Sequence, residues 1–326
     1  MLSRSRTSTR RVVAVLAAAI AVLGVVAGCS GDDALEQSGP TRDYRDARGT
    51  VVAIPQTPTK VVTLSEISLD AALALDVTPV GTTSARGQQS TPAYLGQRAA
   101  DIPIVASSGS PDLQKILKLR PDLILVDDTT GAKNSIGELS KIAPTVQIGK
   151  FVDSWQTYLG AVAEVLNRHP QHQQVVDKIN AQVAETKKAV AARAGTDAPL
   201  TASVVRWAAN GPTIIGAHSL SAWALEQVGM TRPKAQAAID STNRSGQRVS
   251  LENIDLIDAD YLFFGALAGQ DQARKDLATA RDLPGFTGLA AARGNHIYPV
   301  DGVPWTSASG PLGLQVILND IAAAVR

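Results

Sequence analysis

Residues 169–195 read HPQHQQVVDKINAQVAETKKAVAARAG and have the pattern of one long helix. Pro170 suits the first turn, apolar residues recur at helical spacing as far as Val190, and Gly195 can end the helix. Lys187 and Lys188 favour the negative end of the helix dipole. At about 1.5 Å per residue the helix would be roughly 36 Å long, which is enough to reach from one lobe to another.

We therefore predict a linker helix over residues 169–194, between an N-terminal lobe at 49–168 and a C-terminal lobe at 195–326. The alternative is an ordinary surface helix inside a single domain. The likeness of the two flanking stretches favours the linker.

Short apolar strands alternate with helices on both sides of this helix. Asp122–Val126 is an unbroken apolar strand after its first residue, which is typical of a parallel sheet buried on both faces. The pattern predicts an α/β fold of two Rossmann-like, three-layer lobes. Strands are expected near 60–64, 79–82, 102–106, 122–126, 145–148, 201–208, 261–264 and 296–300. Helix starts are expected at Ser68, Ser110–Pro111, Ser154, Ser219 and Gly310–Pro311.

The two flanks also match each other in sequence. Residues 113–126 align without a gap on residues 251–264, so that the apolar positions coincide and Asp122 falls on Asp260. Earlier in each half, the segment that starts at Ser68 matches the segment that starts at Ser219. Two matches in the same order indicate two related lobes.

Composition describes a globular protein with a proper core. The chain has 326 residues, of which 44% are hydrophobic and 19% charged, and its formal net charge is +1. Four arginines lie in the first 28 residues, so the rest carries 27 basic against 30 acidic side chains. This balance disfavours nucleic acid binding, which needs a clear basic excess. The single cysteine excludes an intramolecular disulfide framework.

The first 28 residues have the form of an export signal, with a basic start and an apolar run from Val12 to Val26. The end of this leader, Val26–Cys29, resembles the bacterial lipobox, in which the cysteine is diacylated. We expect a lipid anchor at Cys29, a flexible tether over 29–48, and a location at the extracytoplasmic face of the cell membrane. Arg10–Arg11 leaves both Sec and twin-arginine export open.

Several short segments, in this order, resemble a known family. They are Lys60–Leu64, Pro79–Gly81, Ile116–Leu125, Val204–Arg206, Val249–Glu252, Ile257–Asp260 and Tyr298–Gly302. The chain resembles the FecB-like or BtuF-like solute-binding lipoproteins of bacterial ABC importers for ferric siderophores, haem or cobalamin. The likeness covers about residues 49–326.

The resemblance implies two lobes on one rigid helix with a ligand cleft between them, the class III periplasmic-binding-protein type. It implies a monomer without catalytic residues or a cofactor, which delivers its ligand to a FecCD-type permease. In the family, one glutamate near the top of each lobe docks on the permease. Glu252 has that place in the second lobe, whereas Gln114 has it in the first, so that either Asp112 supplies the charge or the contact is asymmetric.

Candidate ligand contacts follow from the expected C-terminal ends of the strands, where ligands bind in such sheets. Arginine there can bind an anionic iron chelate through a charged fork, and tryptophan can offer an apolar face. The candidates are Arg86 and Tyr94 in the loop 82–99, and Arg206, Trp207, Trp223, Arg244 and Trp305 in the second half, where Arg248 shares a polar loop with Arg244. Each tryptophan has a second interpretation as core, and Arg86 and Tyr94 have one as lobe surface.

We expect a ferric siderophore as the ligand, with haem or cobalamin as the alternative. Haem needs an axial ligand such as Tyr94, His218 or Tyr298, none of which is marked out by spacing. Only four histidines are present, so a direct metal site is poorly supported. An exported α/β hydrolase is the rival class, but no Gly-x-Ser-x-Gly elbow occurs.

Overall fold

The structure is a computed structural model that describes residues 39–107, 110–150, 153–195, 198–236, 246–307 and 310–326. The expected export signal, Cys29 and Arg244 lie outside these residues. Among the helices within these ranges, none is long and apolar enough to cross a membrane.

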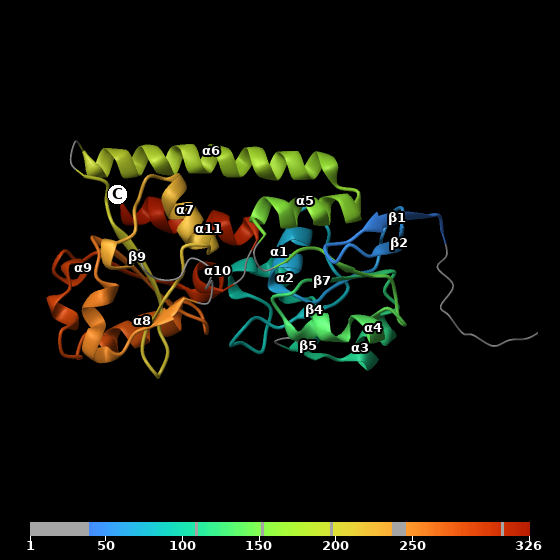
Figure 1. Ribbon diagram of the computed structural model, residues 1–326, viewed down its shortest axis with the longest axis horizontal. Coiled ribbons are helices and arrows are strands. Elements are labelled where there is room, and N and C mark those ends of the chain that lie inside the picture. The colour runs from blue at the N-terminus through green and yellow to red at the C-terminus, as the bar shows by residue number, and fades with distance from the viewer. Residues whose placement is uncertain (1–38, 108–109, 151–152, 196–197, 237–245, 308–309) are drawn as a thin grey trace, which may run out of the picture. The chain divides into compact units, whose positions relative to one another are not determined.

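Helix α6 (His169–Ala194) is the longest helix of the described chain and spans the expected linker. It packs on α5 (Trp155–Leu166) of the first half and on α11 (Pro311–Ala324) of the second (Figure 1). Ile179 and Val190 are buried along its inner side, whereas most of its other residues are at least partly exposed. This helix therefore contacts both halves through a narrow apolar stripe.

The strands before α6 pair only with one another among the named strands, and so do those after it. In the first half, β3 (Val61–Thr63), β7 (Leu123–Val126) and β8 (Thr145–Gln147) form a parallel sheet. A parallel bridge between Val62 and Gly81 joins β3 to the sheet of β4 (Thr82–Thr83), β5 (Ile104–Ser107) and β6 (Ser110–Pro111).

The second half has a sheet with the order β11-β10-β9-β12-β13. Its parallel part consists of β9 (Ala202–Arg206), β12 (Tyr261–Ala266) and β13 (Ile297–Asp301), while β10 (Thr213–Ile214) and β11 (Gln247–Arg248) are antiparallel. The parallel strands β9, β12 and β13 correspond in order to β3, β7 and β8. This repeated topology fits the expected relation between the halves.

The aligned aspartates share two contacts, although Asp122 also accepts from the Lys60 amide at 3.0 Å and the Asp260 amide donates to the Thr201 hydroxyl at 2.9 Å. Asp122 Oδ2 accepts from the amide and the hydroxyl of Thr59 at 2.7 and 2.8 Å. Asp260 Oδ2 accepts from the amide and the hydroxyl of Thr201, also at 2.7 and 2.8 Å. Each aspartate ties the start of one central strand to the segment that leads into its neighbour. The gapless alignment of these residues is thus matched by their geometry.

The remaining elements are short or cover the sheets. They are β1 (Thr41–Arg45), β2 (Val51–Pro55), α1 (Glu66–Ala74), η1 (Ala93–Leu95), α2 (Gln97–Ala100), α3 (Leu113–Leu119), η2 (Gly131–Ser135), α4 (Ile136–Leu139), α7 (Leu220–Gln227), η3 (Lys234–Gln236), η4 (Leu251–Ile257), α8 (Gln270–Ala280), η5 (Phe286–Gly288), α9 (Ala290–Arg293) and α10 (Gly302–Thr306).

Three local expectations differ from the structure. Helix α1 is capped by Ser65, and Ser68 is instead the third helical residue of a capping box, so the match of Ser68 with Ser219 is three residues out of register. Ser110–Pro111 forms a short strand and does not start the helix. The cap of α3 is Asp112, whose side chain accepts from the Lys115 amide. The hairpin of β1 and β2 begins inside the stretch expected to be a tether.

The core on the α6 side contains residues from both halves. One buried cluster includes Leu159 and Val162 of α5 together with Leu314 and Leu318 of α11. Trp155 and Trp223 meet edge to face across it, with ring centroids 5.8 Å apart. The two halves are therefore packed together along this side.

Asp70 of α1 fastens the start of α11 to the first half. Its carboxylate is fully buried and accepts from the amides of Leu312 and Gly313, both at 2.8 Å. Tyr94 donates to the same carboxylate at 2.8 Å. Gly310 is needed beside it, since a Cβ there would lie 2.5 Å from Asp70 Oδ1. The burial raises the pKa of Asp70 to about 6, although all of these hydrogen bonds act to lower it.

Candidate functional site

Arg206 ends strand β9, at the edge where the parallel strands of the second half terminate. Its side chain is half-buried, and Nη1 donates to the backbone oxygen of Thr306 at 3.1 Å. Burial lowers the pKa of Arg206, and the charges of Arg86 and Arg248 lower it further. The guanidinium is thus held in a partly dry, positively charged surrounding.

Arg86 comes from the first half, in a tight loop after β4. The loop is closed by hydrogen bonds from Ala85 N to Ser90 O and from Gln88 N to Ala85 O. Arg86 is half-buried, and its Nη2 donates to the backbone oxygen of Thr129 at 3.3 Å, in the segment that follows β7. The two central strands of the first half therefore both contribute to its position.

Arg248 is the third member of this group and lies at the end of β11. Asn210, in the turn between β9 and β10, orients its amide oxygen towards Arg248 and accepts from Nη1 and Nη2 at 2.8 and 3.1 Å. The partner of this guanidinium is thus an uncharged amide, which leaves the positive charge in place.

Three arginines from both halves therefore act on one another, and we call Arg86, Arg206 and Arg248 the arginine cluster. Among the residues that the structure describes, none of the three is within ion-pair distance of a carboxylate. Guanidinium groups without a carboxylate partner are suited to donate to the oxygen atoms of an anion.

Two buried carboxylates lie behind Arg86. Glu66 is 4% exposed and accepts from the Arg86 amide at 2.7 Å and from the Ser307 hydroxyl at 3.2 Å. Asp127 is fully buried and accepts from the amide and hydroxyl of Thr129 at 2.8 and 2.5 Å. Burial raises the pKa of both groups, whereas the charge of Arg86 partly lowers that of Glu66.

The tryptophans lie mostly in the core. Trp207, next to Arg206, is half-buried and stacks on Phe264 with ring centroids 4.8 Å apart. Trp305 is only 1% exposed, stacks on Phe263 and donates to Asp320 at 2.8 Å. Trp223 belongs to the contact with Trp155. The structure therefore packs Trp207 on Phe264 and Phe286 and gives Trp223 and Trp305 packing roles as well.

Tyr94 is also committed to a structural contact. Its hydroxyl donates to Asp70, and its ring packs against the buried cluster that contains Leu69 and Leu73. Burial and the nearby Asp70 charge raise its pKa well above the usual value, so the hydroxyl stays a donor. Tyr298, a further haem-ligand candidate, donates to Ala324 O at 2.8 Å. Both phenols named as haem ligands thus have protein partners.

The two docking candidates lie on the surface. Gln114 is exposed in the first turn of α3, and Glu252 is exposed in the first turn of η4. Asp112, which precedes Gln114, caps α3 and lies 3.7 Å from Lys115 Nζ. A carboxylate is therefore present near Gln114, although its charge is shared with a lysine.

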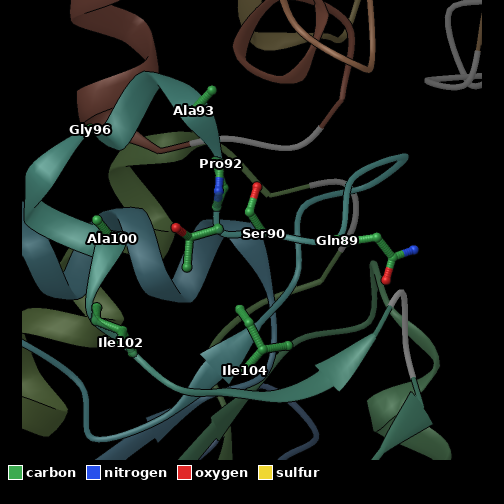
Figure 2. A pocket seen from close by; sticks show the side chains of 9 residues that line it. Gln89, Ser90, Pro92, Ala93, Gly96, Ala100, Ile102 and Ile104 are labelled. Atoms are coloured by element: carbon green, nitrogen blue, oxygen red, sulfur yellow. The ribbon is translucent and has the colours of Figure 1, made fainter.

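The first half also contains an open pocket of about 510 Å³ (Figure 2). Ser90, Pro92 and Ala93 lie on one side of it, and Ile102 and Ile104 on the other. None of its lining residues is charged. Since the pocket offers no charge, the anionic groups of a ligand would find their partners at the arginine cluster.

Within the described residues, no group of three or more His, Cys, Asp or Glu side chains is placed to hold a metal ion.

The sequence matches the model of the periplasmic binding protein family over residues 61–304. This chain belongs to that family. Its curated relatives include the probable siderophore-binding lipoprotein YfiY of Bacillus subtilis, which is 27% identical over 87% of each chain. The Fe(3+)-citrate-binding protein YfmC of the same organism is 25% identical over 98% of this chain and 99% of its own length.

Solved periplasmic binding proteins have the same fold. Staphylococcus aureus SirA, in complex with staphyloferrin B, superposes with a TM-score of 0.73 at 26% identity. The alignment covers 87% of this chain and 98% of SirA. The class III fold expected from the sequence is thereby confirmed, as is membership in a family of binding proteins.

Sequence reasoning overlooked Glu66. Glu66 directly follows Ser65, and in the sequence this pattern indicates only the start of a helix. Its link to the second half depends on Ser307, which is 241 positions away in the chain. No local pattern contains that contact.

Proposed function

We propose that this protein captures a ferric siderophore between its two halves and delivers it to the permease of an ABC importer. The observation that carries the proposal is the arginine cluster. The charge of Arg86, from the first half, acts on Arg206 of the second half, as does the charge of Arg248. A cluster without carboxylate partners favours a chelate with several negative charges. The names of YfiY, YfmC and the SirA complex support the same ligand class.

The proposed contacts are the arginine cluster and Trp207, with Arg244 kept from the sequence as a further candidate. The proposed lobes are residues 49–168 and 195–326. We also propose that Cys29 carries the lipid anchor, that the protein acts as a monomer, and that Glu252 docks on the permease while Asp112 or Gln114 makes the weaker contact of the first half.

A panel of ligands tests this function directly. The purified protein is incubated with ferric citrate, ferric staphyloferrin B, ferric enterobactin, haemin and cobalamin, and then desalted. We expect a ferric charge-transfer band to be retained with at least one siderophore. With haemin we expect at most a weak Soret band, because Tyr94 and Tyr298 already have protein partners and, of the three candidates, only the exposed His218 is left to ligate it. Retention of haem or cobalamin alone would overturn the proposal.

A further inference from the structure

The loop that carries Arg86 is tied to the second half at two points. On one side of Arg86, its own amide donates to Glu66 Oε1 at 2.7 Å, and Glu66 Oε2 accepts from the Ser307 hydroxyl at 3.2 Å. On the other side, Gln88 Nε2 donates to the backbone oxygen of Leu267 at 2.8 Å. Arg86 therefore lies between two hydrogen-bonded links across the halves.

The Glu66 link ends next to the residue that holds Arg206. Ser307 follows Thr306, whose backbone oxygen accepts from Arg206 Nη1 at 3.1 Å. Thr306 is itself fixed, because its hydroxyl donates to Gly302 O at 2.6 Å and its methyl group lies close to Gly265. A continuous polar connection thus runs from the Arg86 amide through Glu66 and Ser307 to the anchor of Arg206.

A favourable charge at the helix N-terminus does not account for this arrangement. The interaction with the helix dipole is a small contribution even in a partly buried site, and Glu66 is only 4% exposed. Burying a carboxylate is costly unless specific hydrogen bonds compensate. The two donors to Glu66, the Arg86 amide and the Ser307 hydroxyl, lie on different halves and point to a role in holding those halves in register.

We infer that Glu66 is a positioning residue of the anion site, which sets the spacing between Arg86 and Arg206 by joining the Arg86 loop to Ser307. The inference rests on the proposed function. Glu66 does not touch the ligand; it removes part of the cost of ordering Arg86 when the ligand binds. The positioning depends on the hydrogen bonds of Glu66. Its negative charge does not help, because a negative charge near the arginine cluster repels an anionic ligand.

The first experiment needs no ligand. Amide hydrogen exchange of residues 85–90 is compared in the wild type, Glu66→Ala, Glu66→Gln and Ser307→Ala. Loss of the link should speed exchange of the Arg86 amide by roughly three- to tenfold in Glu66→Ala. Ser307→Ala should show a smaller increase. Glu66→Gln should stay near the wild type, because its amide can still accept from Arg86 and donate to Ser307.

The second experiment measures affinity for ferric citrate and ferric staphyloferrin B by tryptophan quenching. Glu66→Ala should weaken binding by roughly three- to tenfold, and Glu66→Gln should bind as tightly as the wild type or more tightly. In an Arg86→Ala background, Glu66→Ala should have almost no further effect, because the residue acts through Arg86. Asp46→Ala is the matched control, because Asp46 is a buried carboxylate whose partners, three amides and the Arg48 guanidinium, all lie in the first half.

The outcomes separate this inference from the function on which it rests. If Arg86→Ala and Arg206→Ala leave the affinity for both chelates unchanged, the proposed function of the cluster fails. If the arginine variants bind weakly but Glu66→Ala binds normally, or if Glu66→Gln loses as much as Glu66→Ala, only the positioning role is refuted. Unchanged exchange of the Arg86 amide in Glu66→Ala refutes that role without any ligand.

Discussion

Arg206 combines partial burial with a single backbone partner, so most of its hydrogen-bonding capacity is free for a ligand. If a chelate oxygen binds it directly, Arg206→Ala should weaken binding by about 1.5–3 kcal/mol, the usual worth of a charged hydrogen bond. Arg206→Lys should recover part of this loss, because lysine keeps the charge but lacks the fork. Tryptophan-quenching titrations with ferric siderophores measure both effects.

Arg274→Ala is the matched control for this substitution. Arg274 is an exposed arginine of the second half that pairs with Asp271 at 2.7 Å on α8. Its removal should leave the affinity unchanged at moderate salt, since surface pairs contribute little. Equal affinity of the Arg206→Ala variant and the wild type would remove Arg206 from the site.

Asp70 makes stability depend on pH in a defined direction. Its folded pKa of about 6 lies above the unfolded value of 3.8, so the folded state holds this proton more tightly. This stabilisation is fully present below pH 4 and is lost as the pH rises through about 6, and the total loss is roughly 3 kcal/mol. Asp70→Asn does not titrate and should lack this component.

Denaturant unfolding of the wild type and of Asp70→Asn at several pH values between 4 and 7 measures this pH-dependent contribution of Asp70 to stability. The free energy of unfolding of the wild type should fall relative to that of the variant as the pH rises through this range. A constant difference would show that the Asp70 pKa is not raised in the folded protein.

At the scale of elements, the strand anchors Asp122 and Asp260 should both stabilise the fold, Asp122 somewhat more because it also accepts from the Lys60 amide at 3.0 Å. Each accepts two hydrogen bonds from a threonine at the start of a central strand. Removing either in Asp122→Ala or Asp260→Ala should lower the free energy of unfolding by roughly 1–3 kcal/mol. Because the two share no partner, the losses should add in the double variant. Strong non-additivity in urea unfolding would contradict independent anchors.

Elements with strong local signals could be predicted from the sequence. Helix α6 has a starting proline, a helical repeat and a terminal glycine, and the caps Ser154 and Ser219 lie where expected. Ser110–Pro111 was misjudged because Asp112, two residues later, is also a good cap and is the one that binds the helix amide. Such a competition is decided by the pairing of β5 with β6.

The site was predictable only in part, because its decisive contacts are non-local. An arginine at a strand end is visible in the sequence, and this position alone predicts Arg206 as a ligand contact. The burial of Trp305 depends on Phe263 and Asp320, which other segments supply. An aromatic residue after a strand has the same local pattern whether it faces a ligand or the core.

At the scale of the whole molecule, two features limit movement between the halves. Helix α6 joins them along the chain, and α11 joins them again, because its first amides bind Asp70 while its body packs on α6 and α7. The shared cluster around Leu159 and Leu314 is dry and would have to be opened for a large rotation. Opening apolar surface costs roughly 25 cal/mol per Å².

We therefore expect only a small closure when a siderophore binds, with backbone shifts of about 1 Å, as in other preorganised complexes. Small-angle scattering with and without the ferric siderophore retained in the panel should give nearly the same radius of gyration. Asp70→Ala supplies the contrast, since it frees the start of α11 and should allow a larger change on binding. If α6 and α11 both hold the halves together, no hinge remains about which the halves could close. A large contraction of the wild type would therefore show that α11 does not restrain them.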